Sequence, residues 1–244
     1  ILDSANIVNI LTGKKKSKII ITAHNTLSMQ KTFEYKYIVY PMVRLLYNRA
    51  DKIVCVSKGV MNDLKENFGI DSNILCTIYN GFECPASKID IKTEANNLVS
   101  MGRLEKVKGF DHLIRATALA IKRNPKIRLH ILGDGSLKKS LIKLTQDLKI
   151  EKNIIFHGFV NNPEEILRKA DVFVFASTYE GFGNVLLEAM GLGLPVISTD
   201  YTSGAREILY PSSDLSCIIK DRYEVAPYGI LTPVCKETSL DADG

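Results

Sequence analysis

Short apolar runs alternate with longer amphipathic stretches along the chain, and this alternation predicts strands joined by helices. Runs of Val, Ile, Leu and Phe bounded by Gly, Asn or Asp are typical of parallel strands that helices cover on both faces. We expect the first helix to be entered or kinked at Pro41 and the second to end at Gly69. In this first series the pattern predicts strands within 17–25, 52–57 and 73–81, and helices over 34–50 and 58–69.

A second series of the same kind begins at residue 97. Between the two series, the segment "ECPASKIDIKTEANN" is polar, carries Pro85 and shows no period, which is typical of a linker. The pattern predicts a doubly wound α/β protein, in which ligands bind at the carboxyl ends of the strands. The second series comprises strands over 97–104, 127–133, 153–160, 171–177, 195–199 and 228–233, and helices over 110–124, 136–149, 163–170 and 184–193.

Composition narrows the class of protein. A hydrophobic content of 45% and a charged content of 24% are those of a soluble globular protein. The cysteines are odd in number and lack a C-x-x-C spacing, which argues against a disulfide framework or a zinc site and favours a reducing, cytoplasmic compartment. No apolar run approaches the roughly 20 residues needed to cross a bilayer. Because the chain begins at Ile1, we expect an N-terminal portion to be absent.

Charge is unevenly distributed. Residues 1–60 contain ten Lys or Arg and three acids, a net charge of +7, so the remainder sums to −2 within a total of +5. Two interpretations stay open: a solvated lysine-rich face, or a surface that meets anionic lipid or a phosphorylated acceptor. Nucleic acid is not expected, because the aromatic and basic residues are not interleaved as in nucleic-acid-binding modules.

Two glutamates stand out in "YEGFGNVLLEAMGLGLPVIST", which is otherwise rich in glycine and aliphatic residues. Glu180 falls in the loop directly after the strand 171–177, and Glu188 falls in the early turns of the next helix. Gly181 and Gly183 allow close backbone approach, and the helix amides there can bind an anion. A sugar nucleotide, with separate sugar and ribose hydroxyls, would satisfy both carboxylates. The alternative is that Glu180 caps the helix and Glu188 pairs with a nearby base.

Two cations lie in "MGRLEKVKGFDHL", directly after the first strand of the second series. Arg103 offers a bidentate fork to phosphate oxygens and Lys108 a point charge. Together with a helix N-terminus they can neutralise a diphosphate, so neither a metal nor another cofactor is expected. Lys106 is the alternative cation and is expected to be exposed.

At this point the chain resembles the retaining family 4 (group 1) glycosyltransferases. The resemblance rests on "YEGFGNVLLEAM", "GRLEKVKG", "HILGDGSLKKSL", "IIFHGFVNNPEEILRKADVFVFAS" and "SGAREIL", and it extends from Ser17 to about Pro233. It implies the GT-B architecture, two Rossmann-like domains facing a cleft. We expect residues 1–84 to form the C-terminal part of the first, acceptor-side domain, 85–97 the linker, and 98–244 a donor-binding domain truncated at its C-terminal end.

The resemblance also implies roles for matching residues. Arg103 and Lys108 would hold the diphosphate and stabilise the leaving group, while Glu180 would contact the sugar hydroxyls and Glu188 the ribose. His24 would lie across the cleft near the reacting sugar. The catalytic set implied is therefore His24, Arg103, Lys108 and Glu180. The donor-binding set is Gly102, Arg103, Lys108, Gly158, Phe159 and Val160 beside the base, the backbone of Gly181, Phe182 and Gly183, Glu180, Asn184 and Glu188.

The implied reaction moves a hexose or N-acetylhexosamine from a nucleotide donor, preferably UDP-linked, to a glycan or lipid-linked acceptor, with retention and without a protein nucleophile. Polysaccharide biosynthesis at the cytoplasmic face of the membrane follows, with peripheral contact to anionic lipid. The N-terminal half of the first domain and the C-terminal helices of the family are not in this chain, and Ala205 stands where many relatives carry proline. We therefore expect a fragment that binds donor and needs the missing parts for turnover.

Three other functions are weighed against this one. A nicotinamide-dependent dehydrogenase is disfavoured, because "ILGDGSLKKSL" lacks the third glycine of G-x-G-x-x-G. A sugar-nucleotide epimerase or phosphorylase on the same fold stays open. So does a non-catalytic sugar-nucleotide-binding protein, although four site residues together argue against decay of the site.

Overall fold

The computed structural model describes residues 2–13, 17–83 and 96–235, so most of the predicted linker and the C-terminal "LDADG" lie outside the described residues. The chain divides into two compact units. Unit 1 comprises Ile1–Gly81, Tyr179–Gly183 and Thr202–Glu207. Unit 2 comprises Phe82–Thr178, Asn184–Tyr201 and Ile208–Gly244. Both contain a parallel sheet with helices, which confirms the expected α/β class, while the predicted domain boundaries stay predictions.

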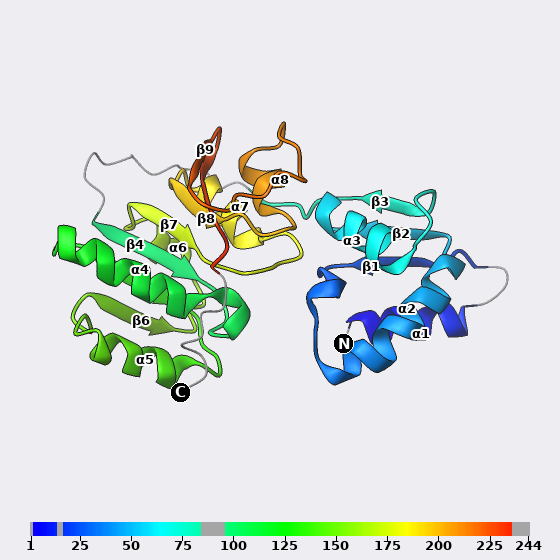
Figure 1. Cartoon of the computed structure of the whole chain (residues 1–244), viewed down its shortest axis with the longest axis horizontal. Coiled ribbons are helices and arrows are strands. Elements are labelled where there is room, and N and C mark those ends of the chain that lie inside the picture. Colours follow the sequence, from blue (N-terminus) through cyan, green and yellow to red (C-terminus); the bar gives the residue numbers. More distant parts are fainter. Residues whose placement is uncertain (1, 14–16, 84–95, 236–244) are drawn as a thin grey trace. The chain divides into compact units, whose positions relative to one another are not determined.

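Unit 1 is built on a three-stranded parallel sheet in the order β1-β2-β3 (Figure 1). Alternate strand residues such as Ile21 and Ile53 are buried, as expected for strands that helices cover. The regular elements are α1 (Leu2–Thr12), β1 (Ile20–Ala23), η1 (Leu27–Met29), η2 (Tyr35–Val39), α2 (Tyr40–Leu46), η3 (Tyr47–Arg49), β2 (Lys52–Cys55), α3 (Lys58–Phe68) and β3 (Leu75–Thr77).

The helix predicted over 34–50 is present, but it changes pitch. A π-helical turn, η2, precedes Pro41 in the first turn of α2. Proline cannot donate a backbone hydrogen bond and its ring crowds the preceding turn, so a wider turn directly before it relieves that conflict. The helix predicted to end at Gly69 does so, with Gly69 in the left-handed conformation (φ 69°) and its N–H bonded to the carbonyls of Leu64 and Lys65.

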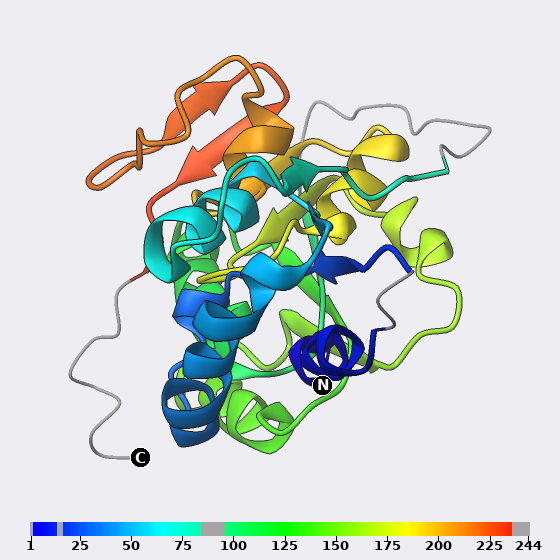
Figure 2. The ribbon, with the colours of Figure 1, turned by 90° about the vertical axis from the view of Figure 1, so that its right-hand side faces the viewer.

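Unit 2 contains a seven-stranded sheet in the order β6-β5-β4-β7-β8-β10-β9. All neighbours are parallel except β9 and β10, which pair antiparallel at one edge (orange to red in Figure 2). The strands are β4 (Asn97–Met101), β5 (Arg128–Leu132), β6 (Ile154–Gly158), β7 (Val172–Phe175), β8 (Val196–Thr199), β9 (Glu224–Ala226) and β10 (Gly229–Thr232).

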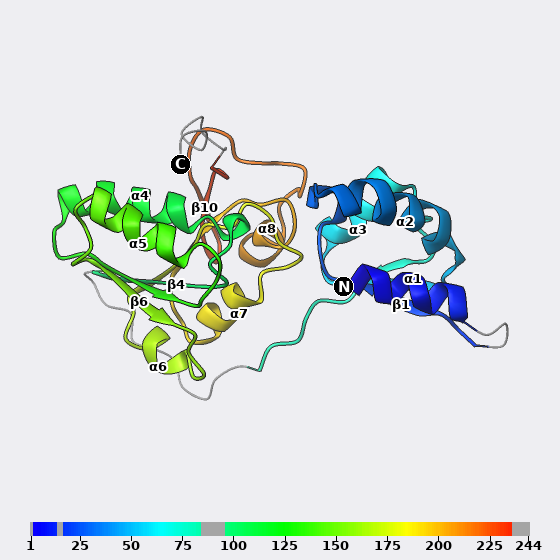
Figure 3. The same ribbon diagram turned by 90° about the horizontal axis from the view of Figure 1, so that it is seen from below.

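Helices cover both faces of this sheet, as predicted. Figure 3 shows α4 and α5 on one face and α6 and α7 on the other. The core between the sheet and the first pair includes Phe110, Ile114, Leu129 and Ile131, all buried. The helices of unit 2 are η4 (Lys106–Lys108), α4 (Phe110–Arg123), α5 (Lys138–Asp147), α6 (Glu164–Leu167) and α7 (Asn184–Gly191); α8 (Ala205–Leu209) spans the junction of the two units.

The strand order determines where a ligand can bind. Reading outward from β4, the chain first adds β5 and β6 on one side and then β7, β8 and β10 on the other. Ligands of such sheets bind at the carboxyl ends of the strands where this order reverses, here between β4 and β7. Within the described residues, no helix combines the length and apolar character required to span a membrane.

Candidate functional site

The loop that follows β4 lies at this point of reversal and carries the two predicted phosphate-binding cations. Arg103 is exposed and Lys108 is partly exposed. The Lys108 side chain runs past Gly102, and its Nζ lies 5.6 Å from the centroid of the Phe175 ring at the end of β7. The amide of Thr178 donates to the carbonyl of Val107 at 2.8 Å, which ties this loop to the end of β7. Lys106, the alternative cation, is exposed.

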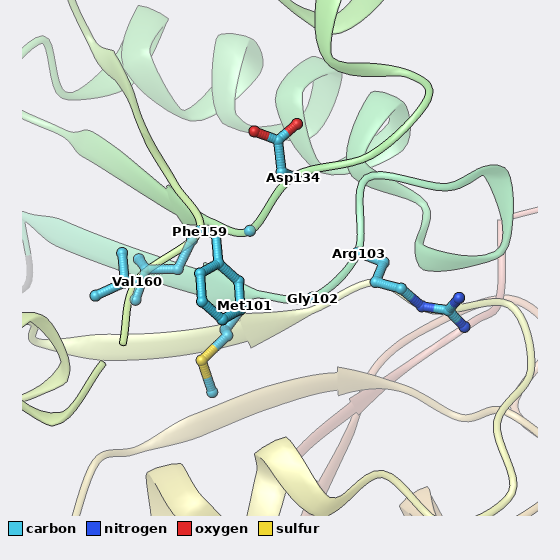
Figure 4. Close-up of a pocket in the computed structure, with 8 residues that line it drawn as sticks. Met101, Gly102, Arg103, Asp134, Phe159 and Val160 are labelled. Carbon is cyan, nitrogen blue, oxygen red and sulfur yellow. The ribbon is translucent and has the colours of Figure 1, made fainter. Parts of the chain in front are cut away.

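A pocket of about 250 Å³ opens beside Arg103 at the ends of β4, β5 and β6. Figure 4 shows Phe159 and Val160 gathered with Met101 on one side, while the guanidinium of Arg103 extends away from them. An apolar hollow of this kind suits a planar base with a charged group beside it. The lining residues are Met101, Gly102, Arg103, Leu132, Gly133, Asp134, Phe159 and Val160.

Glycines keep the walls of this pocket close together. Gly133 has a φ of 130°, and a Cβ there would overlap the carbonyl oxygen of Gly102. Gly158, predicted to flank the base, has a φ of 70° and accepts a hydrogen bond from the amide of Gly133 at 2.7 Å. Sequence reasoning did not assign Gly133 or Asp134 to the site, although "HILGDG" at the end of β5 contained the signal.

Two carboxylates on the loops after β4 and β5, Glu105 and Asp134, already have hydrogen-bond partners. Asp134 accepts from Lys138 Nζ at 2.6 Å, and this hydrogen bond lowers the pKa of its carboxyl. Glu105 accepts from the hydroxyl of Ser136 at 2.8 Å, which lowers the pKa of Glu105. Both carboxylates therefore have partners within the protein.

Glu188, on α7 directly after β7, behaves differently. Its side chain is half-buried, and desolvation raises the pKa of its carboxyl. Among residues 2–13, 17–83 and 96–235, no hydrogen bond or salt bridge to this carboxylate is found, so these residues give no support to the alternative that Glu188 pairs with a nearby base. Asn184, which begins the same helix, is exposed.

The remaining predicted residues belong to unit 1, where two of them meet. His24 follows β1 and is exposed, and a Cβ on Gly181 would overlap its carbonyl oxygen. Gly183 has a φ of 98°, which favours glycine. Phe182 is buried and stacks on Tyr79 with ring centroids 5.2 Å apart, so its side chain serves packing.

Several residues of unit 1 were missed in the sequence. The carboxylate of Glu207 accepts from the amides of Lys58 and Gly59 at 2.7 and 2.8 Å, at the start of α3, and from the hydroxyl of Tyr79 at 3.0 Å. Burial and this carboxylate raise the pKa of Tyr79 to about 12. Only "SGAREIL" hinted at Glu207. Buried Thr26, Ser57 and Ser203 gave no signal, because isolated hydroxyl residues are common in loops.

The structure thus describes the predicted residues as two groups. Unit 2 holds Gly102, Arg103, Lys108, Gly158, Phe159, Val160, Asn184 and Glu188, and unit 1 holds His24, Glu180, Gly181, Phe182 and Gly183. The described residues contain no group of three or more His, Cys, Asp or Glu that could hold a metal ion. Metal-independent binding of the donor remains a prediction.

Comparison with known proteins identifies the family. The model for "Glycosyl transferases group 1" matches residues 86–220, and that for "Glycosyltransferase Family 4" matches residues 4–84. The Campylobacter jejuni N-acetylgalactosamine-N,N'-diacetylbacillosaminyl-diphospho-undecaprenol 4-alpha-N-acetylgalactosaminyltransferase is 38% identical over 171 residues, covering 68% of this chain and 46% of that protein. An uncharacterized glycosyltransferase of Methanocaldococcus jannaschii is 32% identical over 225 residues, covering 88% and 55%.

Solved structures agree on the fold. The crystal structure of Anabaena Alr3699/HepE in complex with UDP-glucose superposes with a TM-score of 0.73 at 20% identity, over 95% of this chain and 63% of that one. The chain spans about half the length of the curated relatives it matches. Since the group 1 model covers more than half of its residues, this chain belongs to the glycosyl transferases of group 1.

Proposed function

We propose that the protein transfers a sugar from a UDP-linked donor to a glycan or lipid-linked acceptor with retention of anomeric configuration. The observation that carries the proposal is Glu188. A half-buried carboxylate that has no partner among the residues the structure describes is unfavourable unless a ligand supplies its hydrogen bonds. It lies on the helix after β7, at the edge of the sheet where nucleotides bind in this fold. The two hydroxyls of a ribose are suitable donors for it.

The remaining contacts follow from chemistry. Phe159 and Met101 offer apolar surface to the base, and Arg103 and Lys108 neutralise the diphosphate. Glycosyl transfer passes through an oxocarbenium-like state while negative charge accumulates on the leaving phosphate. Cations already in place lower the barrier by stabilising that charge where it develops. Glu180 accepts hydrogen bonds from the hydroxyls of the donor sugar. The β-phosphate oxygen takes the proton from the attacking hydroxyl of the acceptor, on the same face of the sugar.

Relatives support the choice of donor and acceptor. The Anabaena structure holds UDP-glucose, and the name of the Campylobacter relative specifies a diphospho-undecaprenol acceptor. For this chain we propose the same classes, a UDP-sugar and a glycan or lipid-linked acceptor. Peripheral contact with an anionic membrane is part of the proposal, because exposed apolar residues and cations share one helix of unit 1.

Calorimetric titration of this chain with UDP, GDP and ADP tests the proposal. A charge-assisted hydrogen bond contributes about 1.5–3 kcal/mol, so Arg103→Ala and Glu188→Gln should each weaken UDP binding about tenfold or more. Lys139→Ala and Glu165→Gln are matched controls, because both residues are exposed on helices of unit 2 outside the site. Equal binding of UDP by all four variants would contradict the assignment.

Product analysis of the longer protein separates transfer from the alternatives. Transfer yields free UDP and a new glycoside, whereas an epimerase yields an isomerised UDP-sugar. A non-catalytic binding protein yields neither. A dehydrogenase would instead require a nicotinamide dinucleotide, which this chain should not bind.

A further inference from the structure

The loop 179–183, which carries Glu180, is held by the hydroxyls of two buried side chains. Thr26, 4% exposed, donates to the carbonyl of Glu180 at 2.8 Å. Ser57, 0% exposed, donates to the carbonyl of Gly181 at 2.7 Å. Thr26 and Ser57 come from the loops directly after β1 and β2. Two neighbouring peptide groups of one loop are therefore fixed from two strand ends of unit 1.

Each hydroxyl has a second partner that defines its orientation. The Thr26 and Ser203 oxygens are 2.6 Å apart. Because the single hydroxyl hydrogen of Thr26 goes to Glu180, Ser203 is the donor to Thr26. Ser57 accepts from the amide of Val60 at 3.0 Å as the N-cap of α3. Hydroxyls oriented in this way keep their directions without the bound ligand.

The backbone around the loop leaves no room for adjustment. Gly204 has a φ of 99°, and a Cβ there would overlap the carbonyl oxygen of Phe182. A Cβ on Gly59 would come within 2.6 Å of the carbonyl oxygen of Thr202. Both glycines, like Gly181, allow backbones to meet that any side chain would separate. This packing and the hydrogen bonds of Thr26 and Ser57 together fix the position of the loop.

We propose that Thr26 and Ser57 are positioning residues for the donor sugar. Their hydroxyls hold the peptide groups at Glu180 and Gly181, and so determine where the Glu180 carboxylate meets the sugar hydroxyls. The inference rests on the proposed function, in which Glu180 binds the sugar and Arg103, Lys108 and Glu188 bind the nucleotide. The binding free energy of a sugar nucleotide then has two parts, one from the UDP group and one from the sugar. Loss of the Thr26 hydroxyl weakens the part from the sugar and leaves the part from UDP unchanged.

The test compares UDP with UDP-glucose, UDP-galactose and UDP-N-acetylglucosamine by calorimetry on this chain. The quantity measured is the ratio of the dissociation constant for UDP to that for the tightest sugar nucleotide. Thr26→Val, which preserves shape, should lower this ratio by about 5- to 10-fold, since it leaves the partly buried carbonyl of Glu180 without its donor. Ser57→Ala should act in the same direction, with an added loss of thermal stability from the missing helix cap.

Two further variants make the outcome specific. Thr26→Ser retains the hydroxyl and should retain the ratio. Thr117→Val is the matched control, because Thr117 is buried and donates to the carbonyl of Leu113 at 2.8 Å inside α4. It removes a buried hydroxyl of the same kind from unit 2, and its ratio should stay that of the wild type. A ratio that falls equally in both valine variants would assign Thr26 a merely structural role.

The failure of this inference is distinguishable from that of the proposed function. If the wild-type chain binds no UDP, the proposed function fails and the positioning role fails with it. If it binds UDP but no sugar nucleotide more tightly, the sugar-binding role of the loop is overturned. If it shows a sugar-dependent gain that Thr26→Val preserves, only the role of Thr26 and Ser57 is overturned.

Discussion

At the scale of single residues, Glu188, the proposed ligand-binding carboxylate, differs from a structural carboxylate in the direction of its pKa shift. A structural carboxylate has protein partners that lower its pKa, as Ser136 does for Glu105. Glu188 has the opposite shift, because burial raises its pKa and no partner in the described residues offsets the desolvation. The folded chain therefore binds this proton more tightly than the unfolded chain. Its stabilising effect is present below the ordinary pKa of 4.5 and is lost as pH rises through the raised value.

Glu188→Gln should consequently make the protein more stable at neutral pH while it weakens UDP binding. We expect the Tm to rise by a few degrees at pH 7, since about 1 kcal/mol moves the Tm of a domain of this size by roughly 2–4 °C. The gain should disappear at a pH of about 4, where the Glu188 carboxyl of the wild type is mostly protonated in both the folded and the unfolded chain. Thermal unfolding with and without UDP measures both effects, and Glu165→Gln is the control. A lower Tm at pH 7 would show that Glu188 has a structural partner.

At the scale of elements, the apolar pattern predicted the long helices and buried strands but not the short or irregular ones. In α1, Ile7 and Ile10 are buried while Val8 and Leu11 are exposed, so apolar residues lie around the helix and show no single face. The strand β9 has only three residues, with Val225 exposed, which is too few for an alternation to be recognised. The ends of β4, β6 and β7, which carry the predicted site residues, were predicted because strand ends follow from the apolar runs.

A bulge in the pairing of β5 with β6 could also not be predicted from the sequence. The pairing advances from Ile131 with Phe156 to Leu132 with Gly158, so His157 is the extra residue. It places the His157 ring on that of His130, with Nε2 2.9 Å from Nδ1. Burial lowers the pKa of both imidazoles, and for His130 the neighbouring ring lowers it further.

This pair should make stability depend on pH. Each folded-state pKa lies below the ordinary value of 6.5, so the unfolded chain binds more protons there, and stability falls as pH decreases below about 6.5. His157→Gln keeps a hydrogen-bonding group that does not titrate. Urea unfolding at pH values of about 8 and about 5.5 should show a smaller loss in this variant than in the wild type. Parallel pH profiles would rule out a contribution from the pair.

At the scale of the whole molecule, tertiary contacts divide the chain differently from the linear pattern. The loops 179–183 and 202–207 follow β7 and β8 in sequence but belong to unit 1. Contacts such as that between Thr26 and Glu180 join residues more than a hundred positions apart. Local periodicity contains no information on such pairs, so the sequence could propose site residues but could not predict which side chains hold them in place.

The excess of positive charge in residues 1–60 is a property of the whole chain. Part of this charge lies on and beside one helix of unit 1, which also exposes apolar side chains. Every fourth residue from Phe33, just before η2, to Leu45 in α2 is apolar and exposed, Phe33 by 75% and Leu45 by 73%; the residues between them in this stripe are Tyr37 and Pro41. Ile38 lies beside this stripe. The opposite face of the helix, with Val39, Val43, Leu46 and Tyr47, is buried, so the stripe is not used by the core of unit 1.

Cations accompany the stripe. Lys36 Nζ lies 5.3 Å above the ring of Tyr37, and Lys31 is exposed nearby. Aromatic and apolar side chains flanked by cations are suited to the interface of an anionic bilayer. The ordinary interpretation of such a helix is core packing alone, and its buried face fulfils that role. The exposed stripe needs a second explanation, and the proposed lipid-linked acceptor offers one.

We therefore expect this chain to bind vesicles that contain phosphatidylglycerol and not vesicles of phosphatidylcholine alone. Binding should weaken between about 0.05 and 0.5 M salt, because the Debye length becomes shorter and the attraction between the lysines and the anionic lipid is screened. Phe33→Gln with Leu45→Gln should abolish most of it, whereas Leu119→Gln, a residue 63% exposed on α4, should leave it unchanged. Co-sedimentation with vesicles measures the binding of the wild type, the double variant and the Leu119 variant. Binding that is insensitive to salt and equal in every variant would leave the basic character of residues 1–60 as a solvated surface, and the acceptor would then have to reach the protein from solution.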